Sequence, residues 1–276
     1  MKPKLKKETI IPFLKWAGGK QWLTQYLMPF ILPSKGKYIE PFLGGGSMYF
    51  SMLPQRACLS DSNRDLVETY QTIKREARAV ADRLRRFSFT NDCYYRVRGS
   101  NPSSSVGRAA RFIYLNRTCW NGLYRVNREG KFNVPMGSFD SPPDFLVTDR
   151  LIAAQRALKS ATILCQDFEA AIESAKRGDT VYLDPPYTVA HNNNGFLRYN
   201  DLVFSWCDQK RLATAARKLR ERGCKVILSN ADHPSITELY NDFVITKLQR
   251  KSLVAAETTK RRPITELLIT SFSFEK

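Results

Sequence analysis

The tetrapeptide Asp184-Pro185-Pro186-Tyr187 has residue types suited to methylating an amino group on a flat base. It follows the apolar run 181–183, so it stands at the C-terminal end of an expected strand. Such an amine is a poor nucleophile because its lone pair is delocalised into the ring. The carboxylate and a carbonyl of the Pro-Pro backbone, whose φ angles are fixed, can accept its two hydrogens, and the tyrosine can stack on the base. A Pro-rich turn with Asp as a turn residue is the alternative.

A glycine-rich turn at residues 40–47, Glu-Pro-Phe-Leu-Gly-Gly-Gly-Ser, can bring a cofactor against the backbone. Glycines leave room for that approach, and free amides at a helix start can hold a carboxylate. The turn lacks the G-x-G-x-x-G pattern, which argues against NAD. Asp61 ends the next expected strand and should lie beside this turn, where an acid can hold the two hydroxyls of a ribose. The alternative for Asp61 is the N-cap of the following helix, and both roles can hold.

A second glycine pair lies near the N-terminus, in the segment 13–20, Phe-Leu-Lys-Trp-Ala-Gly-Gly-Lys. A Gly-Gly pair between Trp16 and Lys20 lets the backbone bend around a ligand. Taken alone, the same residues equally describe a turn before a helix.

Strand-like and helix-like segments alternate at both ends of the chain, which predicts a mainly parallel sheet with helices packed on it. The expected helices span residues 47–53, 169–176 and 208–222, the last ending at Gly223. The expected strands span residues 37–42, 57–61, 161–165, 180–183 and 224–228, with 244–248 and 265–272 closing the sheet as an antiparallel hairpin.

The middle of the chain breaks this pattern. Helical spacing covers residues 62–86 and 107–117, and the segments 123–127 and 131–134 flank Arg128-Glu129-Gly130, which predicts a β-hairpin with Gly in its turn. The basic, polar stretch 251–263 is the best candidate for a mobile loop. We therefore expect a catalytic domain formed by residues 1–62 and 151–276, interrupted by an inserted recognition module at 63–150.

The composition favours a folded protein that acts on a polyanion. The 276 residues are 43% hydrophobic and 25% charged, with a formal net charge of +18. An excess of that size attracts polyanions. The alternative is a generally basic surface, but the lysines and arginines also fall near aromatic and turn segments, which favours nucleic acid. No signal-type apolar segment follows the first residues, and no run approaches a membrane-spanning length. We expect a cytoplasmic protein that is associated with the nucleoid through DNA.

Cysteine and histidine usage argues against several other chemistries. The six cysteines include no C-x-x-C pair and are expected to be reduced thiols. Two histidines argue against a His-rich metal site or a Ser-His-Asp triad, so no metal is expected. The H-x-E and P-C-x-x-C pair of a zinc deaminase does not occur. Methylation at carbon 5 of cytosine typically uses a Pro-Cys nucleophile, and the chain has no Pro-Cys dipeptide.

Six motifs in a fixed order give a specific resemblance. They are F-x-K-W-A-G-G-K, E-P-F-x-G-G-G-S, S-D-x-N, N-G-L-x-R-x-N-x-x-G-x-F-N-V-P, D-P-P-Y and I-L-S-N, and they span about residues 12 to 272. The chain resembles the Dam-type DNA adenine methyltransferase family, including its relatives in restriction systems. The resemblance implies a Rossmann-like S-adenosylmethionine-dependent methyltransferase sheet with an inserted, mainly helical DNA-recognition module. It also implies methylation of the exocyclic amino group of adenine in double-stranded DNA.

The resemblance also implies roles for individual residues. Asp61 would hold the ribose of the cofactor and Asp167-Phe168 its adenine, and Asp184, Pro185, Pro186 and Tyr187 would form the catalytic motif. The implied cofactor contacts are Trp16, Ala17, Gly18, Lys20, Phe42, Gly44, Gly46, Asp61, Asp167, Phe168 and Asp184. The implied DNA contacts are Lys15, Trp120, Asn121, Leu123, Arg125, Asn133, Pro135, Phe196, Tyr199 and Lys260.

Base reading is implied at the hairpin. Leu123, Arg125 and Pro135 fall where the family reads base pairs of a GATC site, and an arginine can also make a bidentate contact with guanine on physical grounds alone. Lys15 would lie close to the target base, and Trp120 with Asn121 would enter the helix beside it. Phe196 and Tyr199 would cover the base.

One departure concerns the end of the recognition site. Some relatives have Gly-Arg-Tyr after the F-N-V-P segment, where this chain has Gly137-Ser138-Phe139. This change removes a possible contact with phosphate or a base at the last part of the recognition site.

Taken together, the motifs predict an S-adenosylmethionine-dependent, adenine-specific DNA methyltransferase. It is expected to be monomeric in solution and to act within GATC after base flipping. The alternatives are amino methylation of cytosine or of RNA adenine, and a DNA-binding relative that has lost catalysis.

Overall fold

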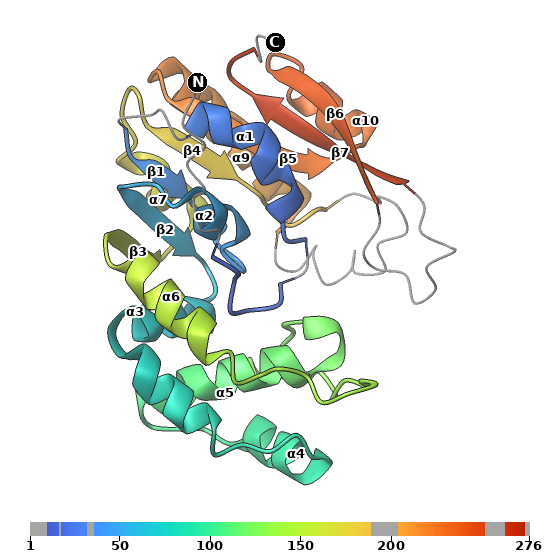
Figure 1. Ribbon diagram of the computed structural model, residues 1–276. Coiled ribbons are helices and arrows are strands. Elements are labelled where there is room, and N and C mark those ends of the chain that lie inside the picture. Colours follow the sequence, from blue (N-terminus) through green and yellow to red (C-terminus); the bar gives the residue numbers. More distant parts are fainter. Residues whose placement is uncertain (1–9, 17, 32–35, 189–203, 252–262, 274–276) are drawn as a thin grey trace, which may run out of the picture. The chain divides into compact units, whose positions relative to one another are not determined.

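The computed structural model describes residues 10–16, 18–31, 36–188, 204–251 and 263–273 (Figure 1). It is a mixed α/β fold with a seven-stranded sheet, which confirms the predicted fold class. The chain divides into two compact units, residues 1–33 with 43–166 and residues 34–42 with 167–276. The inserted module at residues 63–150 stays a prediction.

The first unit is mainly helical and contains one parallel strand pair. β2 (Ala57–Asp61) pairs with β3 (Ala161–Cys165) along its whole length, and α3 (Arg64–Leu84) packs on both strands and on α5 and α6. The apolar residues of α3 recur at helical spacing, so one face is buried. The other elements are η1 (Gln21–Leu23), α1 (Thr24–Ile31), α2 (Ser47–Met52), α4 (Asn91–Gly99), α5 (Ser105–Thr118), η2 (Trp120–Gly122) and α6 (Thr148–Leu158).

The second unit holds five strands in the order β1-β4-β5-β7-β6 (Figure 1). β1 (Tyr38–Glu40), β4 (Thr180–Leu183) and β5 (Lys225–Ala231) are parallel, and β7 (Pro263–Thr270) runs antiparallel to β5 and to β6 (Val244–Lys251). Every residue of β4 is buried, as expected for a central parallel strand. The helices are α7 (Phe168–Glu173), α9 (Trp206–Glu221) and α10 (Pro234–Leu239), with α9 packed on β5 and α7.

All seven predicted strands are present, and the antiparallel closure by β6 and β7 is confirmed. β5 continues to Ala231, beyond the predicted end at residue 228, because the polar side chains of Ser229 and Asn230 find buried hydrogen-bond partners. The predicted loop at 251–263 begins and ends in paired strand residues, and residues 252–262 lie outside the described ranges.

Helices α4 and α10 were not predicted from the sequence. Both are short, and each starts at a capping side chain: Thr90 accepts from the amide of Cys93, and His233 accepts from the amide of Ser235. Helices of this length carry too few turns for apolar periodicity to identify them.

The predicted β-hairpin is present in a reduced form. Its bridge pairs Val126 with Phe132, and the Asn127 carboxamide accepts hydrogen bonds from the amides of Glu129 and Lys131 across the turn. The Asn127 amide donates to the Lys131 carbonyl and the Asn133 amide to the Arg125 carbonyl, which form this single bridge. The predicted hairpin with Gly130 in its turn is therefore present, as an isolated bridge and not as a pair of strands.

Candidate active site and nucleic-acid interface

Asp184 follows the last residue of β4, and a buried serine of the neighbouring strand holds its carboxylate. Leu183 pairs with Leu228 in parallel register, so Asp184 and Ser229 are the next residues of adjacent strands. The Ser229 hydroxyl donates a 2.7 Å hydrogen bond to Asp184 Oδ1 and lies 3.1 Å from the Tyr182 hydroxyl. Ser229 is 1% exposed. A buried donor in this position restricts the rotation of the carboxylate.

The rest of the tetrapeptide is also held by side chains of the second unit. Gln209 Nε2 donates to the Pro186 carbonyl at 3.4 Å, and Gln209 Oε1 accepts from Asn230 Nδ2 at 3.1 Å. Both amide side chains are fully buried. The Tyr187 hydroxyl donates to Glu266 Oε2 at 3.2 Å. Residues of α9, β5 and β7 therefore fix the tetrapeptide, which is more than a Pro-rich turn requires.

An aromatic cluster with one acid lies at the start of α7. The Phe168 ring stacks on Phe42 with centroids 5.5 Å apart, and Phe204 contacts both rings. Phe168 is buried, whereas the Asp167 side chain is 51% exposed and caps the helix. Arg211 of α9 contacts both Asp167 and Phe168. The acid is thus the accessible group of the pair, and the phenylalanine anchors it.

Asp61 fixes the glycine turn in the first unit. Its Oδ2 accepts from the Gly44 amide and its Oδ1 from the Asn63 amide, both at 3.0 Å. Burial raises the pKa of the Asp61 carboxyl, and the backbone hydrogen bonds oppose the rise. The N-cap of α3 is Asn63, whose side chain accepts from the Leu66 amide. The alternative that Asp61 caps the helix was therefore wrong.

Trp16 gives a physical reason for two of the glycines. A Cβ at Gly44 would lie 2.8 Å from the Trp16 ring, and a Cβ at Gly45 would lie 2.7 Å from Trp16 Cβ. The indole stacks on Phe112 and Tyr124, with centroids 6.5 and 6.0 Å apart. Trp16 therefore occupies the space beside these two glycines, and the contact of the turn with a cofactor stays a prediction.

Lys15 is tied to the end of α5. The Asn116 side chain accepts from the Lys15 amide at 2.8 Å and donates to the Lys15 carbonyl at 2.7 Å and the Gly122 carbonyl at 3.2 Å. The Lys15 ammonium lies 5.2 Å from the centre of the Phe139 ring. Burial, together with the charge of Arg117, lowers the pKa of Lys15. The structure therefore brings Lys15 together with the segment that contains Trp120, which is 48% exposed, and Asn121, which is also exposed.

The hairpin presents one arginine in a fixed orientation. Arg125 is exposed, and its Nε donates to Asn133 Oδ1 at 2.8 Å across the hairpin. Asn133 is therefore a partner of Arg125 in addition to its predicted contact with DNA. The Pro135 carbonyl accepts from the Trp120 amide, and Leu123 is half-buried.

The other predicted residues divide into two groups. The first group lies within the described ranges. Lys20 is 4% exposed, and its Nζ lies 3.9 Å from the position that a Cβ would take at Gly18. Gly46 has a φ of 68° and packs against Tyr70 and Phe50. Four predicted residues lie outside the described ranges: Ala17, Phe196, Tyr199 and Lys260.

Sequence reasoning gave no role to the residues that hold these side chains, although Ser229 and Asn230 belong to the I-L-S-N motif. Ser229, Gln209, Asn230 and Glu266 are each at most 2% exposed, and so is Asn116. The signal available was a polar residue in an otherwise apolar strand or helix face, because a buried polar group requires a hydrogen-bond partner.

The comparisons with known proteins identify the family. A sequence model described as D12 class N6 adenine-specific DNA methyltransferase matches residues 16–253. The chain belongs to this family. It is 36% identical over 273 residues to a type II methyltransferase of Lactococcus lactis subsp. cremoris, covering 95% of each chain. It is 37% identical over 286 residues to one of Methanocaldococcus jannaschii, covering 95% of this chain and 99% of the relative. It is 31% identical to the DNA adenine methylase of Escherichia coli, covering 93% of each chain.

S-adenosylmethionine is the methyl donor of this D12-class enzyme, and the described acids fit it. The Asp61 oxygens accept from backbone amides, and a carboxylate has about four acceptor positions, so it can also accept from a ribose hydroxyl. The half-exposed Asp167 can accept from an adenine amino group. Among the described residues, no cluster of His, Cys, Asp or Glu could hold a metal ion. The same part of the chain contains no helix long and apolar enough to span a membrane.

Proposed function

We propose that this D12-class enzyme methylates adenine within GATC sites of duplex DNA, after the target base has rotated out of the helix. The observation that carries the proposal is the Asp184 carboxylate at the end of β4, held by the buried Ser229 hydroxyl. In a duplex the adenine amino group is occupied by base pairing, so the enzyme has to extrude the base.

The proposed chemistry uses acceptors already fixed by the fold. Asp184 accepts one hydrogen of the target amine, a carbonyl of the Pro-Pro backbone accepts the other, and Tyr187 stacks on the base. The carboxylate orients the amine and takes up its proton as the new bond forms. S-adenosylmethionine supplies an electrophilic methyl group when bound. Positioning and hydrogen bonding therefore carry the rate enhancement.

The cofactor roles are assigned within each unit. In the first unit, Asp61 holds the ribose, and the residues about the glycine turn line the methionine part: Trp16, Ala17, Gly18, Lys20, Gly44 and Gly46. In the second unit, Asp167 and Phe168 hold the adenine, and Phe42 supports the Phe168 ring.

Recognition is assigned to the hairpin and the segments around it. Arg125 reads a guanine, Leu123 and Pro135 contact neighbouring base pairs, and Trp120 with Asn121 fills the space beside the extruded base. The net charge of +18 supports a duplex polyanion as substrate. We further propose that the enzyme is a cytoplasmic monomer bound to the nucleoid through DNA.

Replacing Ser229 with alanine should lower kcat about tenfold and leave the KM for S-adenosylmethionine unchanged, because the carboxylate of Asp184 stays but rotates more freely. A hydrogen bond to a charged group contributes about 1.5 kcal/mol or more, which corresponds to about a tenfold change. Steady-state kinetics with the cofactor varied would measure both constants. Ser60→Ala is the matched control, because Ser60 is also a buried strand serine and its hydroxyl has no hydrogen-bond partner within the described ranges. Equal rates for the two variants would remove the role of Ser229.

Replacing Asp61 with alanine should weaken S-adenosylmethionine binding by about 1.5–3 kcal/mol, the range for losing a hydrogen bond to a charged group. Isothermal titration calorimetry would give the dissociation constant. Asp82→Ala removes an exposed carboxylate of α3 and should leave binding unchanged. An unchanged dissociation constant for Asp61→Ala would leave Asp61 as an anchor of the turn alone.

The pH dependence of the same titration is a further check. Burial raises the pKa of Asp61 above 3.8, so its carboxylate becomes protonated at a higher pH than an exposed one. A protonated acid accepts fewer hydrogen bonds from the ribose. Cofactor affinity should therefore fall as the pH decreases through this raised pKa, and the Asp61→Ala variant should lose that dependence.

Two assays on synthetic duplexes test the proposed function. Tritium transfer from labelled S-adenosylmethionine should be fast on a GATC duplex and slow on a duplex of the same composition with the site permuted, or on the corresponding RNA. A GATC duplex with 2-aminopurine at the target position should become more fluorescent on binding as the base unstacks. Equal transfer to both DNA duplexes would refute GATC specificity, and unchanged fluorescence would refute base flipping.

A further inference from the structure

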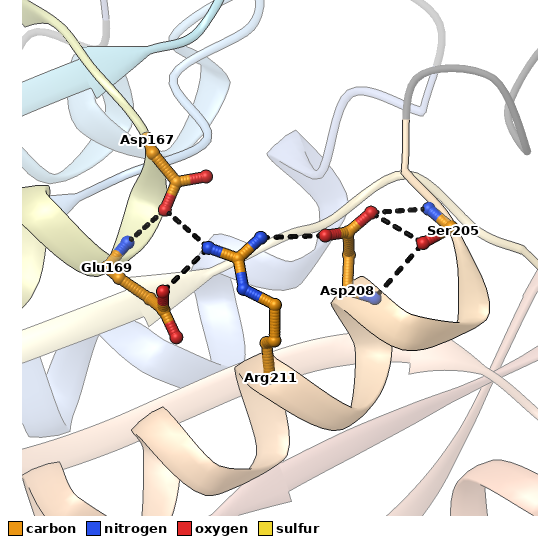
Figure 2. Close-up of polar contacts among 5 residues, drawn as sticks. All are labelled: Asp167, Glu169, Ser205, Asp208 and Arg211. Carbon is orange, nitrogen blue, oxygen red and sulfur yellow. Dashed lines mark hydrogen bonds and ion pairs between the residues drawn. The ribbon is translucent and has the colours of Figure 1, made fainter.

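Arg211 of α9 gathers three carboxylates around one guanidinium group, as Figure 2 shows. Its Nη1 lies 2.7 Å from Asp208 Oδ1, and its Nη2 lies 2.6 Å from Glu169 Oε2 and 3.1 Å from Asp167 Oδ1. The two nitrogen atoms thus connect the start of α9 with the start of α7. Three acids and one cation leave an excess of negative charge, so the arginine reduces the repulsion among the three acids.

The same guanidinium also contacts the Phe168 ring. Arg211 Cζ lies 4.9 Å from the ring centroid, and the ring is 4% exposed. A planar guanidinium can contact carboxylates with its edges and an aromatic ring with its face. A lysine ammonium is a point charge that cannot serve both partners in this way.

The arginine orients one particular oxygen of Asp167. Asp167 Oδ1 accepts from the Glu169 amide at 2.9 Å and from Arg211, and both contacts are drawn in Figure 2. In the described part of the chain, these hydrogen bonds fall on Oδ1, so Oδ2 is the oxygen left to accept from a ligand. The side chain is 51% exposed, and Arg211 adds a second contact to the Glu169 amide that already holds it.

Arg211 is itself held by a capping box at the start of α9. The amide and hydroxyl of Ser205 donate to Asp208 Oδ2 at 2.8 and 2.7 Å, and the Asp208 amide donates to the Ser205 hydroxyl at 3.2 Å (Figure 2). The hydrogen bonds from Ser205 lower the pKa of Asp208, so this acid is charged at neutral pH. Because Asp208 is fixed and binds Nη1 of Arg211, it also fixes the position from which Nη2 reaches Asp167.

We propose that Arg211 is a positioning residue for the cofactor, which holds Asp167 so that Oδ2 accepts the amino group of the cofactor's adenine. This inference rests on the proposed role of Asp167 in binding that adenine. The ion pairs are exposed, and pairs of this kind contribute little to folding stability. Arg211 therefore affects cofactor affinity more than it affects the stability of the fold.

The test compares Arg211→Ala and Arg211→Lys with a matched control on the same helix. Arg220 also forms an ion pair, 2.7 Å from Asp242, and also contacts a ring, 4.5 Å from the centroid of Phe243. Calorimetry would give the dissociation constant for S-adenosylmethionine, kinetics the KM values for cofactor and DNA, and thermal unfolding the Tm.

Arg211→Ala should weaken cofactor binding about tenfold, raise the KM for the cofactor in parallel, and leave the KM for DNA unchanged. Arg211→Lys should recover only part of the loss, because it restores the charge without the planar fork. Arg220→Ala should change the Tm about as much as Arg211→Ala and leave cofactor binding unchanged. Equal cofactor affinity in Arg211→Ala and wild type would overturn the proposal, and so would equal losses in the Arg211→Ala and Arg220→Ala variants.

A double-mutant cycle separates this inference from the proposed function. If Arg211 acts through Asp167, the Asp167→Asn and Arg211→Ala losses should be strongly non-additive. Additive losses would show that Arg211 acts by another route, while the function stands. A wild-type protein that transfers methyl groups normally while Asp167→Asn binds the cofactor unchanged would refute the adenine assignment, and the inference with it.

Discussion

Replacing Asp184 with alanine should lower the rate of methyl transfer by about three orders of magnitude, within the range of 10²–10⁴ for a positioned proton acceptor. The carboxylate is held by the buried Ser229 hydroxyl at the end of β4, so its removal leaves the target amine without an oriented acceptor. The lone pair of the amine then stays delocalised into the ring. Single-turnover methylation of a GATC duplex would measure the chemical step.

Cofactor binding provides the control for this loss. Asp184→Ala should bind S-adenosylmethionine with close to wild-type affinity and unfold at a similar temperature, because the neighbouring contacts of Gln209 and Glu266 remain. The rates should follow the order wild type, then Ser229→Ala, then Asp184→Ala. A folded, cofactor-binding Asp184→Ala variant with activity within about tenfold of wild type would remove Asp184 from the catalytic role.

Replacing Arg125 with alanine should reduce activity on GATC and make the enzyme tolerate a changed outer base pair. A bidentate contact between arginine and guanine provides about 1–3 kcal/mol of discrimination, or roughly 5- to 150-fold. Asn133 already orients the guanidinium across the hairpin, so the contact is prepared before binding. Methylation rates on GATC and on duplexes altered at the first base pair would give the discrimination ratio.

The matched control lies in the turn of the same hairpin. Arg128 is exposed, and the loss of a contact from it to phosphate would weaken binding to all sequences about equally and reduce the salt dependence. Arg128→Ala should therefore leave the discrimination ratio unchanged. If Arg125→Ala slowed every duplex by one common factor, the hairpin would be an electrostatic anchor, and the GATC assignment would lose its main support.

The pattern of apolar residues predicted the strands of the sheet well, but it did not predict the buried polar side chains at the end of β5. Strands such as β4 are continuous buried runs, which sequence alone identifies. The end of β5 was misplaced because Ser229 and Asn230 look like strand-ending residues until their partners, Asp184 and Gln209, are known. Those partners lie far away in the sequence, so no local pattern could indicate them.

The sequence allowed a candidate site residue to be predicted only where that residue belongs to one of the motifs. The structure gives Asp61 two amide donors and assigns the cap of α3 to Asn63, a distinction that depends on backbone geometry two residues away. It also shows that Trp16 packs against Gly44, which a list of motifs cannot reveal. Arg211 belongs to no recognised motif, and only the fold brings it to Asp167.

The enzyme should transfer the methyl group to the amino group of adenine and to no other base of its site. A GATC duplex tests it by internal competition, because its adenine and its cytosine both carry exocyclic amino groups. The duplex would be methylated with tritiated S-adenosylmethionine and digested to nucleosides, and the labelled nucleoside would be identified by chromatography. The label should appear in N6-methyl-2′-deoxyadenosine, and it should be lost in Asp184→Ala. Label in N4-methyl-2′-deoxycytidine, or transfer that persists in Asp184→Ala, would contradict it.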